Sequence, residues 1–178
     1  MKATGIVRRI DDQGRVVIPK EIRRTLRIRE GDPLEIFTEK DGSVIFKKYS
    51  LMDDQSEFAQ QVCDAMYRAT GGVAVVTDRD MIVACAGAPR KELAERRLSP
   101  ELGQVMEARQ LYRGTKDGPP ALLCQGEPSL EVLAAAPVLS GGDLLGCVAY
   151  AGEGGVAGET ECKLAQAMAN FLGRHMEQ

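Results

Sequence analysis

The sequence has no long apolar run and no leader of the usual kind. No apolar stretch approaches the ~18 residues that a membrane-spanning helix needs. The first nine residues, from Met1 to Arg9, lack the apolar core of a signal peptide. We therefore expect a cytoplasmic protein without a membrane partner.

Metal-ligand clusters and closely paired cysteines are also missing. The one histidine, His175, has no nucleophile near it in sequence that it would activate as a catalytic base. No Cys-x-x-Cys pair occurs among the cysteines, which are Cys63, Cys85, Cys124, Cys147 and Cys162. Because zinc sites need Cys and His in tight clusters, we expect neither a metal nor a cofactor. We interpret the thiols as reduced and buried.

Positive charge is concentrated at one end of the chain. Residues 1–50 carry 12 Lys and Arg against 8 Asp and Glu, whereas residues 51–178 carry 11 against 18. Within residues 1–29 the counts are 9 and 3. Such asymmetry predicts a nucleic-acid-binding N-terminal part joined to an acidic part with another role.

The basic stretch at residues 14–29 predicts a turn, a short strand and a helix that Pro19 opens. Ile22 and Leu26 lie four residues apart on one helical face, so the arginines between and beside them point outward. Asp-Gly at residues 41–42 indicates a hairpin. The expected elements are strands at 3–10 and 15–18, a helix at about 19–27, and hairpin strands at 34–39 and 43–48.

Size limits what these first 50 residues can do alone. Without a disulfide or a metal, so short a segment buries too little apolar surface for a stable fold. Its short strands also leave open edges. Dimerisation with strands interleaved between two chains would close the edges and double the core, so we expect a homodimer.

The motif Gly-Arg-Val-Val-Ile-Pro at residues 14–19, followed by an arginine pair, closely resembles the signature of the AbrB-type transition-state regulators. The resemblance covers about residues 2–49. It implies a swapped-hairpin β-barrel, an intertwined dimer that binds double-stranded DNA. The family's DNA contacts correspond to Arg8, Arg15, Arg23 and Arg24. Gln13 departs from the pattern, since relatives often have an apolar residue before this glycine.

Residues 51–178 predict an α+β sandwich around an antiparallel sheet. The expected elements are a helix from about 54 to 70, strands at 72–78 and 81–86, helices within 89–109 broken at Ser99-Pro100, strands at 121–124, 132–139 and 144–150, and a helix at 158–176. This order is similar to a GAF domain, a small-molecule sensor module. We therefore expect an AbrB-type DNA-binding domain at 1–50 and a GAF-like regulatory or oligomerisation domain at 51–178, with an unidentified small molecule as its possible ligand.

The outer helices of this second domain carry apolar stripes at helical spacing. They are Phe58, Val62, Ala65 and Ala69 on the first helix, and Leu164, Met168, Phe171 and Leu172 on the last. Either stripe can cover the sheet. Alternatively, two chains pairing these helices would form a four-helix bundle, which together with the N-terminal dimer predicts a homotetramer.

Other functions remain as alternatives. The segment 152–157 fits the Gly-x-Gly-x-x-Ala pattern of a dinucleotide site, but no second strand follows to carry the acidic ribose ligand. A GAF-fold thiol enzyme would need Cys85, Cys124 and Cys147 to meet in one pocket with lowered pKa values. An antitoxin of the swapped-hairpin class would have a short, disordered extension rather than 128 patterned residues. The combined resemblance to regulators of spore development implies instead a transcriptional activator and repressor that is not an enzyme.

Overall fold

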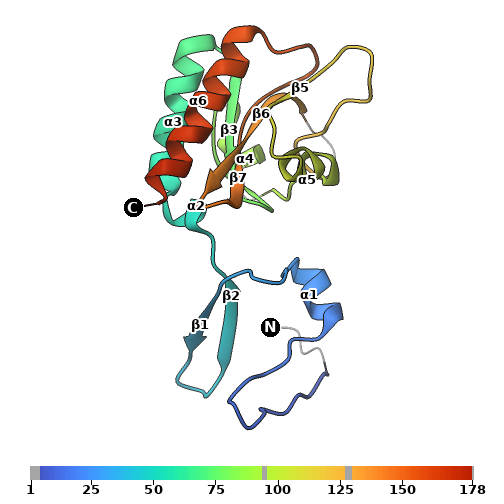
Figure 1. The fold of residues 1–178 in the computed structure, drawn as a ribbon, viewed down its shortest axis with the longest axis vertical. Coiled ribbons are helices and arrows are strands. Elements are labelled where there is room, and N and C mark those ends of the chain that lie inside the picture. Colours follow the sequence, from blue (N-terminus) through green and yellow to red (C-terminus); the bar gives the residue numbers. More distant parts are fainter. Residues whose placement is uncertain (1–4, 94–95, 127–129, 178) are drawn as a thin grey trace. The chain divides into compact units, whose positions relative to one another are not determined.

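The computed structural model describes residues 5–93, 96–126 and 130–177, and the chain divides into two compact units, Met1–Tyr49 and Ser50–Gln178 (Figure 1). Each unit has its own antiparallel sheet, of two strands in the first and five in the second. Among these described residues, no helix is both long enough and apolar enough to cross a membrane.

Over its described residues, 5–49, the N-terminal unit contains one short helix and one β-hairpin. Helix α1 spans Lys20–Leu26, and strand β1 (Leu34–Thr38) pairs with β2 (Val44–Lys48). At the turn Gly42 has a φ of 87°, which glycine adopts without a Cβ clash. Asp41 Oδ1 accepts a hydrogen bond from the Ser43 N–H at 2.8 Å. The predicted helix and hairpin are therefore confirmed, with each end shifted by no more than about two residues, as is usual for element boundaries.

Residues 5–18 form no β-strand in the single chain, so the strands predicted at 3–10 and 15–18 are wrong for one chain by itself; residues 3 and 4 lie outside the described part. The predicted turn does form. The Asp11 N–H donates to the Arg15 carbonyl at 3.0 Å, and the Gly14 N–H donates to the Asp11 carbonyl at 3.1 Å. A strand exists only with a hydrogen-bonded neighbour, and the described part of this chain supplies none beyond the turn.

Apolar side chains of this unit are exposed instead of forming a core. Val7 is 88% exposed and Val17 is 70% exposed, and Leu26 on the expected apolar face of α1 is 52% exposed. The set comprises Ile6, Val7, Ile10, Val16, Val17, Leu26, Ile36, Phe37, Val44 and Phe46. Soluble monomers rarely leave so much apolar surface uncovered in so short a segment. These side chains therefore form no shared core among residues 5–49 of the single chain.

A two-residue connection leads into the second unit, because β2 ends at Lys48 and helix α2 (Leu51–Asp54) follows Ser50. Ser50 Oγ caps α2 by accepting the Asp53 N–H at 3.2 Å. Met52 is buried in the core of the second unit. Helix α3 (Ser56–Thr70) then runs to Gly71, whose φ of 73° ends it. The sequence predicted one helix here, and the structure has two separated at Gln55.

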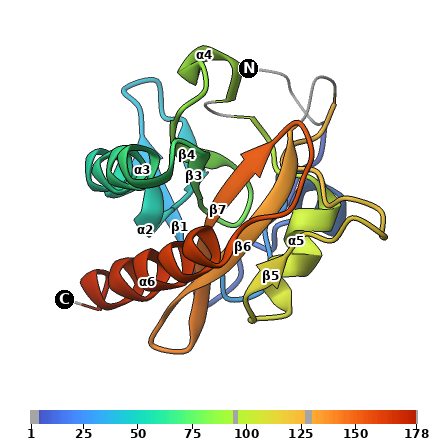
Figure 2. The ribbon, with the colours of Figure 1, turned by 90° about the horizontal axis from the view of Figure 1, so that it is seen from above.

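The five-stranded sheet has the order β4-β3-β7-β6-β5 with every neighbouring pair antiparallel (Figure 2). Its strands are β3 (Val73–Thr77), β4 (Ile82–Ala86), β5 (Tyr112–Arg113), β6 (Glu131–Ser140) and β7 (Asp143–Gly152). The strand predicted at 121–124 is wrong, because this segment makes isolated bridges only, at Leu122 and Cys124. The short strand β5 was not foreseen, because two residues give too little periodicity to recognise.

Helices α3 and α6 (Glu159–His175) lie side by side on one face of the sheet (Figure 2). Their buried positions are Ala59, Val62, Cys63 and Met66 on α3, and Cys162, Ala165, Ala169, Leu172 and Gly173 on α6. Only two residues of the predicted stripes, Val62 and Leu172, belong to this set. The inward face of α6 consists mainly of small residues. A Cβ on Gly173 would clash with the Leu139 carbonyl oxygen, so the helix packs directly on the backbone of β6.

The other face of the sheet is covered by α4 (Arg90–Leu93), by α5 (Pro100–Glu107) and by connecting segments. The predicted break at Ser99-Pro100 is confirmed, since Ser99 Oγ accepts the Leu102 N–H at 3.0 Å and caps α5. Met106 of α5 packs into the core on this face, with Val75, Cys147 and Ala149 from the sheet. The second unit is thus a sheet covered on both faces, with two long helices on one face only.

Candidate nucleic-acid interface

Helix α1 presents an adjacent pair of basic side chains to solvent. Pro19 precedes its first residue with φ −57° and ψ 148°, a geometry that introduces the helix without an N–H to satisfy. Arg23 and Arg24 lie in its last turn, and both are exposed. Within the described chain, no hydrogen bond or ion pair involves either guanidinium group. Their planar donors are therefore available to an anionic partner.

Arg27 closes the helix in the left-handed conformation, with φ 53° and ψ 35°. The Ile28 N–H donates to the Arg23 carbonyl at 2.8 Å, and the Arg27 N–H donates to the Arg24 carbonyl at 3.3 Å. These bonds satisfy the main-chain acceptors of the two arginines. The pair is consequently fixed by the backbone, whereas its side chains remain free to reach outward.

The turn before α1 presents a third arginine. Asp11 Oδ1 accepts the N–H groups of Gln13 (3.0 Å) and Arg15 (2.8 Å), and Asp11 Oδ2 accepts Arg15 Nε at 2.9 Å. The pKa of the Asp11 carboxyl is lowered, chiefly by the hydrogen bond from the Arg15 N–H. Desolvation, the second-largest effect, opposes this, and the Arg15 guanidinium and the Gln13 N–H lower the pKa further. Gly14, with a φ of 74°, permits the turn. The departure at Gln13 leaves this geometry intact.

The fourth predicted residue, Arg8, lies in the irregular segment before this turn, and its side chain is exposed. All four arginines are therefore accessible in the single chain. Among the described residues, no hydrogen bond or ion pair connects Arg8 or Arg15 to α1. Only Arg23 and Arg24 lie on one element of secondary structure, and the contacts of the described residues do not join all four arginines into one surface.

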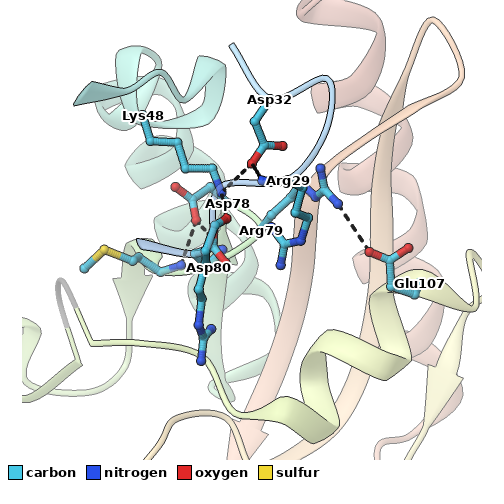
Figure 3. A network of polar contacts seen from close by, with 9 residues as sticks. Arg29, Asp32, Lys48, Asp78, Arg79, Asp80 and Glu107 are labelled. Carbon is cyan, nitrogen blue, oxygen red and sulfur yellow. Dashed lines mark hydrogen bonds and ion pairs between the residues drawn. The ribbon is translucent and has the colours of Figure 1, made fainter. Parts of the chain in front are cut away.

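Two residues that sequence reasoning did not single out hold the end of α1. Lys48 Nζ on β2 donates to the Arg27 carbonyl at 3.1 Å and forms an ion pair with Asp32 Oδ2 at 3.1 Å. The same Asp32 oxygen accepts the Arg29 N–H at 2.8 Å (Figure 3). The only sequence signal was the break at Asp32-Pro33, which marks a turn without naming its partner.

The thiols of the second unit do not resemble an enzyme site. All five cysteines are free and buried. Cys85, Cys124 and Cys147 do line the same core cluster. However, burial raises the pKa of the Cys85 and Cys124 thiols and raises that of Cys147 to about 11, whereas a nucleophilic thiol needs a lowered pKa. The Cys147 thiol also has a buried partner, since Thr77 Oγ1 lies 3.3 Å from Cys147 Sγ.

The remaining candidate motifs have simple structural roles. The glycine-rich segment at 152–157 links β7 to α6, and Gly154 and Gly155 have φ values of 139° and 117°. His175 ends α6 and packs against Phe58, with ring centroids 4.3 Å apart. No group of three or more His, Cys, Asp or Glu side chains suited to a metal occurs in residues 5–93, 96–126 and 130–177.

Comparisons with known proteins found similar families for both parts of the chain. The family model for the C-terminal, transcription-factor domain of stage V sporulation protein T matches residues 54–177. The model for MazE, a bacterial antitoxin of antidote–toxin recognition, matches residues 7–51. The transition state regulatory protein AbrB of Bacillus subtilis is 46% identical over 77 residues, which are 43% of this chain and 78% of that protein.

Two further comparisons cover most of the chain. The GAF domain of a phosphoenolpyruvate-protein phosphotransferase from Coxiella burnetii matches with a TM-score of 0.52 and 14% identity, over 87% of this chain and 88% of that one, which shows the fold alone. Stage V sporulation protein T of Bacillus subtilis is 44% identical over the whole of both chains. The chain therefore belongs to the stage V sporulation protein T family of transcription factors, with an AbrB-type N-terminal domain and a GAF-like C-terminal domain.

Proposed function

We propose that this transcription factor binds double-stranded DNA through Arg8, Arg15, Arg23 and Arg24 of an intertwined N-terminal dimer, and that its GAF-like domain regulates or assembles that dimer. The observation that carries the proposal is the combination of exposed apolar side chains and exposed arginines in one small unit. A second copy of the chain would bury the exposed apolar side chains, and an anionic partner would neutralise the arginines.

The dimer is proposed because the single chain leaves backbone segments unpaired and apolar side chains exposed among its described residues. Residues 5–10 and 15–18 are separated by a formed turn and carry five of the exposed apolar residues, but have no strand partner among the described residues. A second chain contributing the same segments would pair these backbones and cover Leu26, Phe37 and Phe46 as well. Burial of apolar surface at roughly 25 cal/mol per Å² is the available driving force.

DNA recognition follows from charge and shape. Four arginines per chain make eight per dimer on a doubled surface. Most would contact phosphates, which position the protein without reading sequence, and a few would reach guanine O6 and N7. Helix α1 has only seven residues, too few to read many base pairs. Sequence preference is therefore loose, and DNA shape and deformability contribute to it.

The second unit supplies a surface for further assembly. Phe58 and Phe171 pack together with ring centroids 5.6 Å apart, and Phe171 is 51% exposed. Ala65 and Ala69 are exposed on the outer face of α3, where small side chains let another helix approach. Pairing of α3 and α6 between copies would give a four-helix bundle and, with the N-terminal dimer, a tetramer. A ligand of the GAF-like domain would act only through different affinity for two arrangements.

An antitoxin role is the second candidate, favoured by the match of residues 7–51 to an antitoxin model. The part of the chain that follows is a compact unit, Ser50–Gln178, rather than a short extension, which favours regulation of transcription. Titration of DNA binding against salt tests the main proposal. Eight neutralised phosphates predict that log K falls against log salt with a slope of about −7, and binding that is insensitive to salt would overturn it.

A further inference from the structure

We infer that Lys48 and Asp32 form a clamp that positions the arginine pair of α1 for DNA, rather than contacting DNA themselves; this inference rests on the proposed function of that pair. The clamp comprises two contacts that Figure 3 shows, the ion pair of Lys48 Nζ with Asp32 and the bond from the Arg29 N–H to Asp32. Its third contact is the bond from Lys48 Nζ to the Arg27 carbonyl.

The clamp acts at the end of α1 that carries the arginines. The last carbonyls of a helix have no intrahelical donor, and Lys48 Nζ supplies one to the Arg27 carbonyl at 3.1 Å. Its positive charge also suits the negative end of the helix dipole. Because the helix has only seven residues, its propensity alone does not hold it. Its orientation therefore depends on such tertiary contacts.

Asp32 fixes the chain that leaves the helix. Its Oδ2 accepts the Arg29 N–H at 2.8 Å and pairs with Lys48 at 3.1 Å, so one carboxylate ties the turn after α1 to strand β2. The Tyr49 N–H donates to the Pro33 carbonyl at 3.1 Å and extends this connection. Helix, turn and hairpin are thereby joined at the level of Lys48.

The clamp also lies close in sequence to the second unit. Lys48 is the last residue of β2, and Met52, four residues later, is buried in the core of the GAF-like unit. Tyr49 and Ser50 lie between the end of β2 and the start of α2.

Removal of Asp32 distinguishes positioning from simple charge. Asp32→Ala makes a dimer more positive by two charges, so an electrostatic effect alone would tighten DNA binding. Loss of the clamp weakens it instead, by about tenfold, the scale of one lost charge-assisted hydrogen bond. Asp32→Asn keeps an acceptor for the Arg29 N–H and is expected to lose less. Glu39→Ala, which removes the same charge from an exposed position after β1, is the matched control and binds as well as the unaltered protein or more tightly.

The experiment measures affinity of the full-length protein for one DNA duplex at fixed salt, with native mass and circular dichroism checked for each variant. Amide hydrogen exchange at Arg27 and Ile28 should accelerate in Asp32→Ala while exchange within the hairpin is unchanged. If Asp32→Ala does not assemble to the oligomer mass of the unaltered protein, the DNA affinity of Asp32→Asn is used as the test instead. Equal or tighter binding by the folded Asp32 variants overturns the clamp. Full binding by Arg23→Ala/Arg24→Ala would instead overturn the proposed function itself.

Discussion

Replacing Arg23 and Arg24 together by alanine removes half of the positive charge proposed to contact DNA. Both side chains are exposed, and no hydrogen bond or ion pair among the described residues involves them. Alanine is the best helix former, so α1 should remain folded. The main-chain bonds that close the helix, to the carbonyls of these same residues, are unaffected by the change.

The expected magnitude follows from counting charges. If each of the eight arginines per dimer neutralises one phosphate, log K falls against log salt with a slope of about −7, which is a loss of about 10⁴-fold in affinity between 50 and 200 mM; arginines that contact guanine instead make the slope shallower. The double variant keeps four of the eight. Its slope should fall to about −3.6, and its loss over the same range to about 10²-fold. The change of slope separates loss of phosphate contacts from general damage to the protein.

Fluorescence anisotropy with a labelled duplex over a series of salt concentrations measures both slopes. The control is Arg90→Ala/Lys91→Ala, which removes the same charge from exposed positions on α4. It should keep the slope near −7 if eight phosphates are neutralised. If both double variants reduce the slope equally, or if neither does, the assignment of Arg23 and Arg24 to the DNA surface is refuted.

Three further outcomes are expected. Gly173→Ala should lower the free energy of unfolding by about 1–3 kcal/mol, because the added methyl meets a backbone carbonyl, whereas Gly103→Ala, with open space around it, should raise it by about 0.5–1 kcal/mol in denaturant titrations. Phe171→Glu should convert a tetramer to dimers in native mass measurements, and Asn170→Asp, an added charge on an exposed neighbour, should not. Burial raises the pKa of the Cys147 thiol from 9.0 to about 11. The contribution of this neutral, buried thiol to the free energy of unfolding should therefore be complete below pH 9 and be lost as the pH rises toward 11, and Cys147→Ala should flatten that decline.

Each of these also has a result that would contradict it. A more stable Gly173→Ala would mean that α6 does not pack on the β6 backbone as described. A tetramer that survives Phe171→Glu would place the second interface elsewhere than on α3 and α6. Rapid modification of Cys147 by a thiol reagent in the folded protein at pH 8 would contradict its raised pKa and revive the thiol-enzyme alternative.

Local signals in the sequence predicted the elements whose contacts lie near in the chain. Asp41 and Gly42 fixed the first hairpin, and Ser99 with Pro100 fixed the start of α5. These signals work because turns and caps are made by neighbouring residues. The exposure of Arg23 and Arg24 was also predicted, although Leu26 on the expected apolar face of α1 is itself exposed in the single chain.

Features that depend on distant residues or on a second chain were not predictable in this way. The segments 3–10 and 15–18 have a composition typical of β-strands, but the described residues of the single chain provide no neighbouring strand for them to pair with. On α6 the inward face is set by the close approach of Gly173 to β6, which moves the buried stripe away from Phe171. The Lys48–Asp32 pair joins residues 16 positions apart, and no motif announces it.

Amide hydrogen exchange of the full-length protein at residues 6–10 and 15–18 tests most directly the claim that the DNA-binding unit is completed by a second copy. Most of these amides have no hydrogen-bond acceptor in the described part of the single chain. An intertwined dimer predicts strong protection for alternate amides along both segments, to a degree similar to that of β1 and β2. Rapid exchange throughout both segments, in a protein that still binds DNA, would contradict the account.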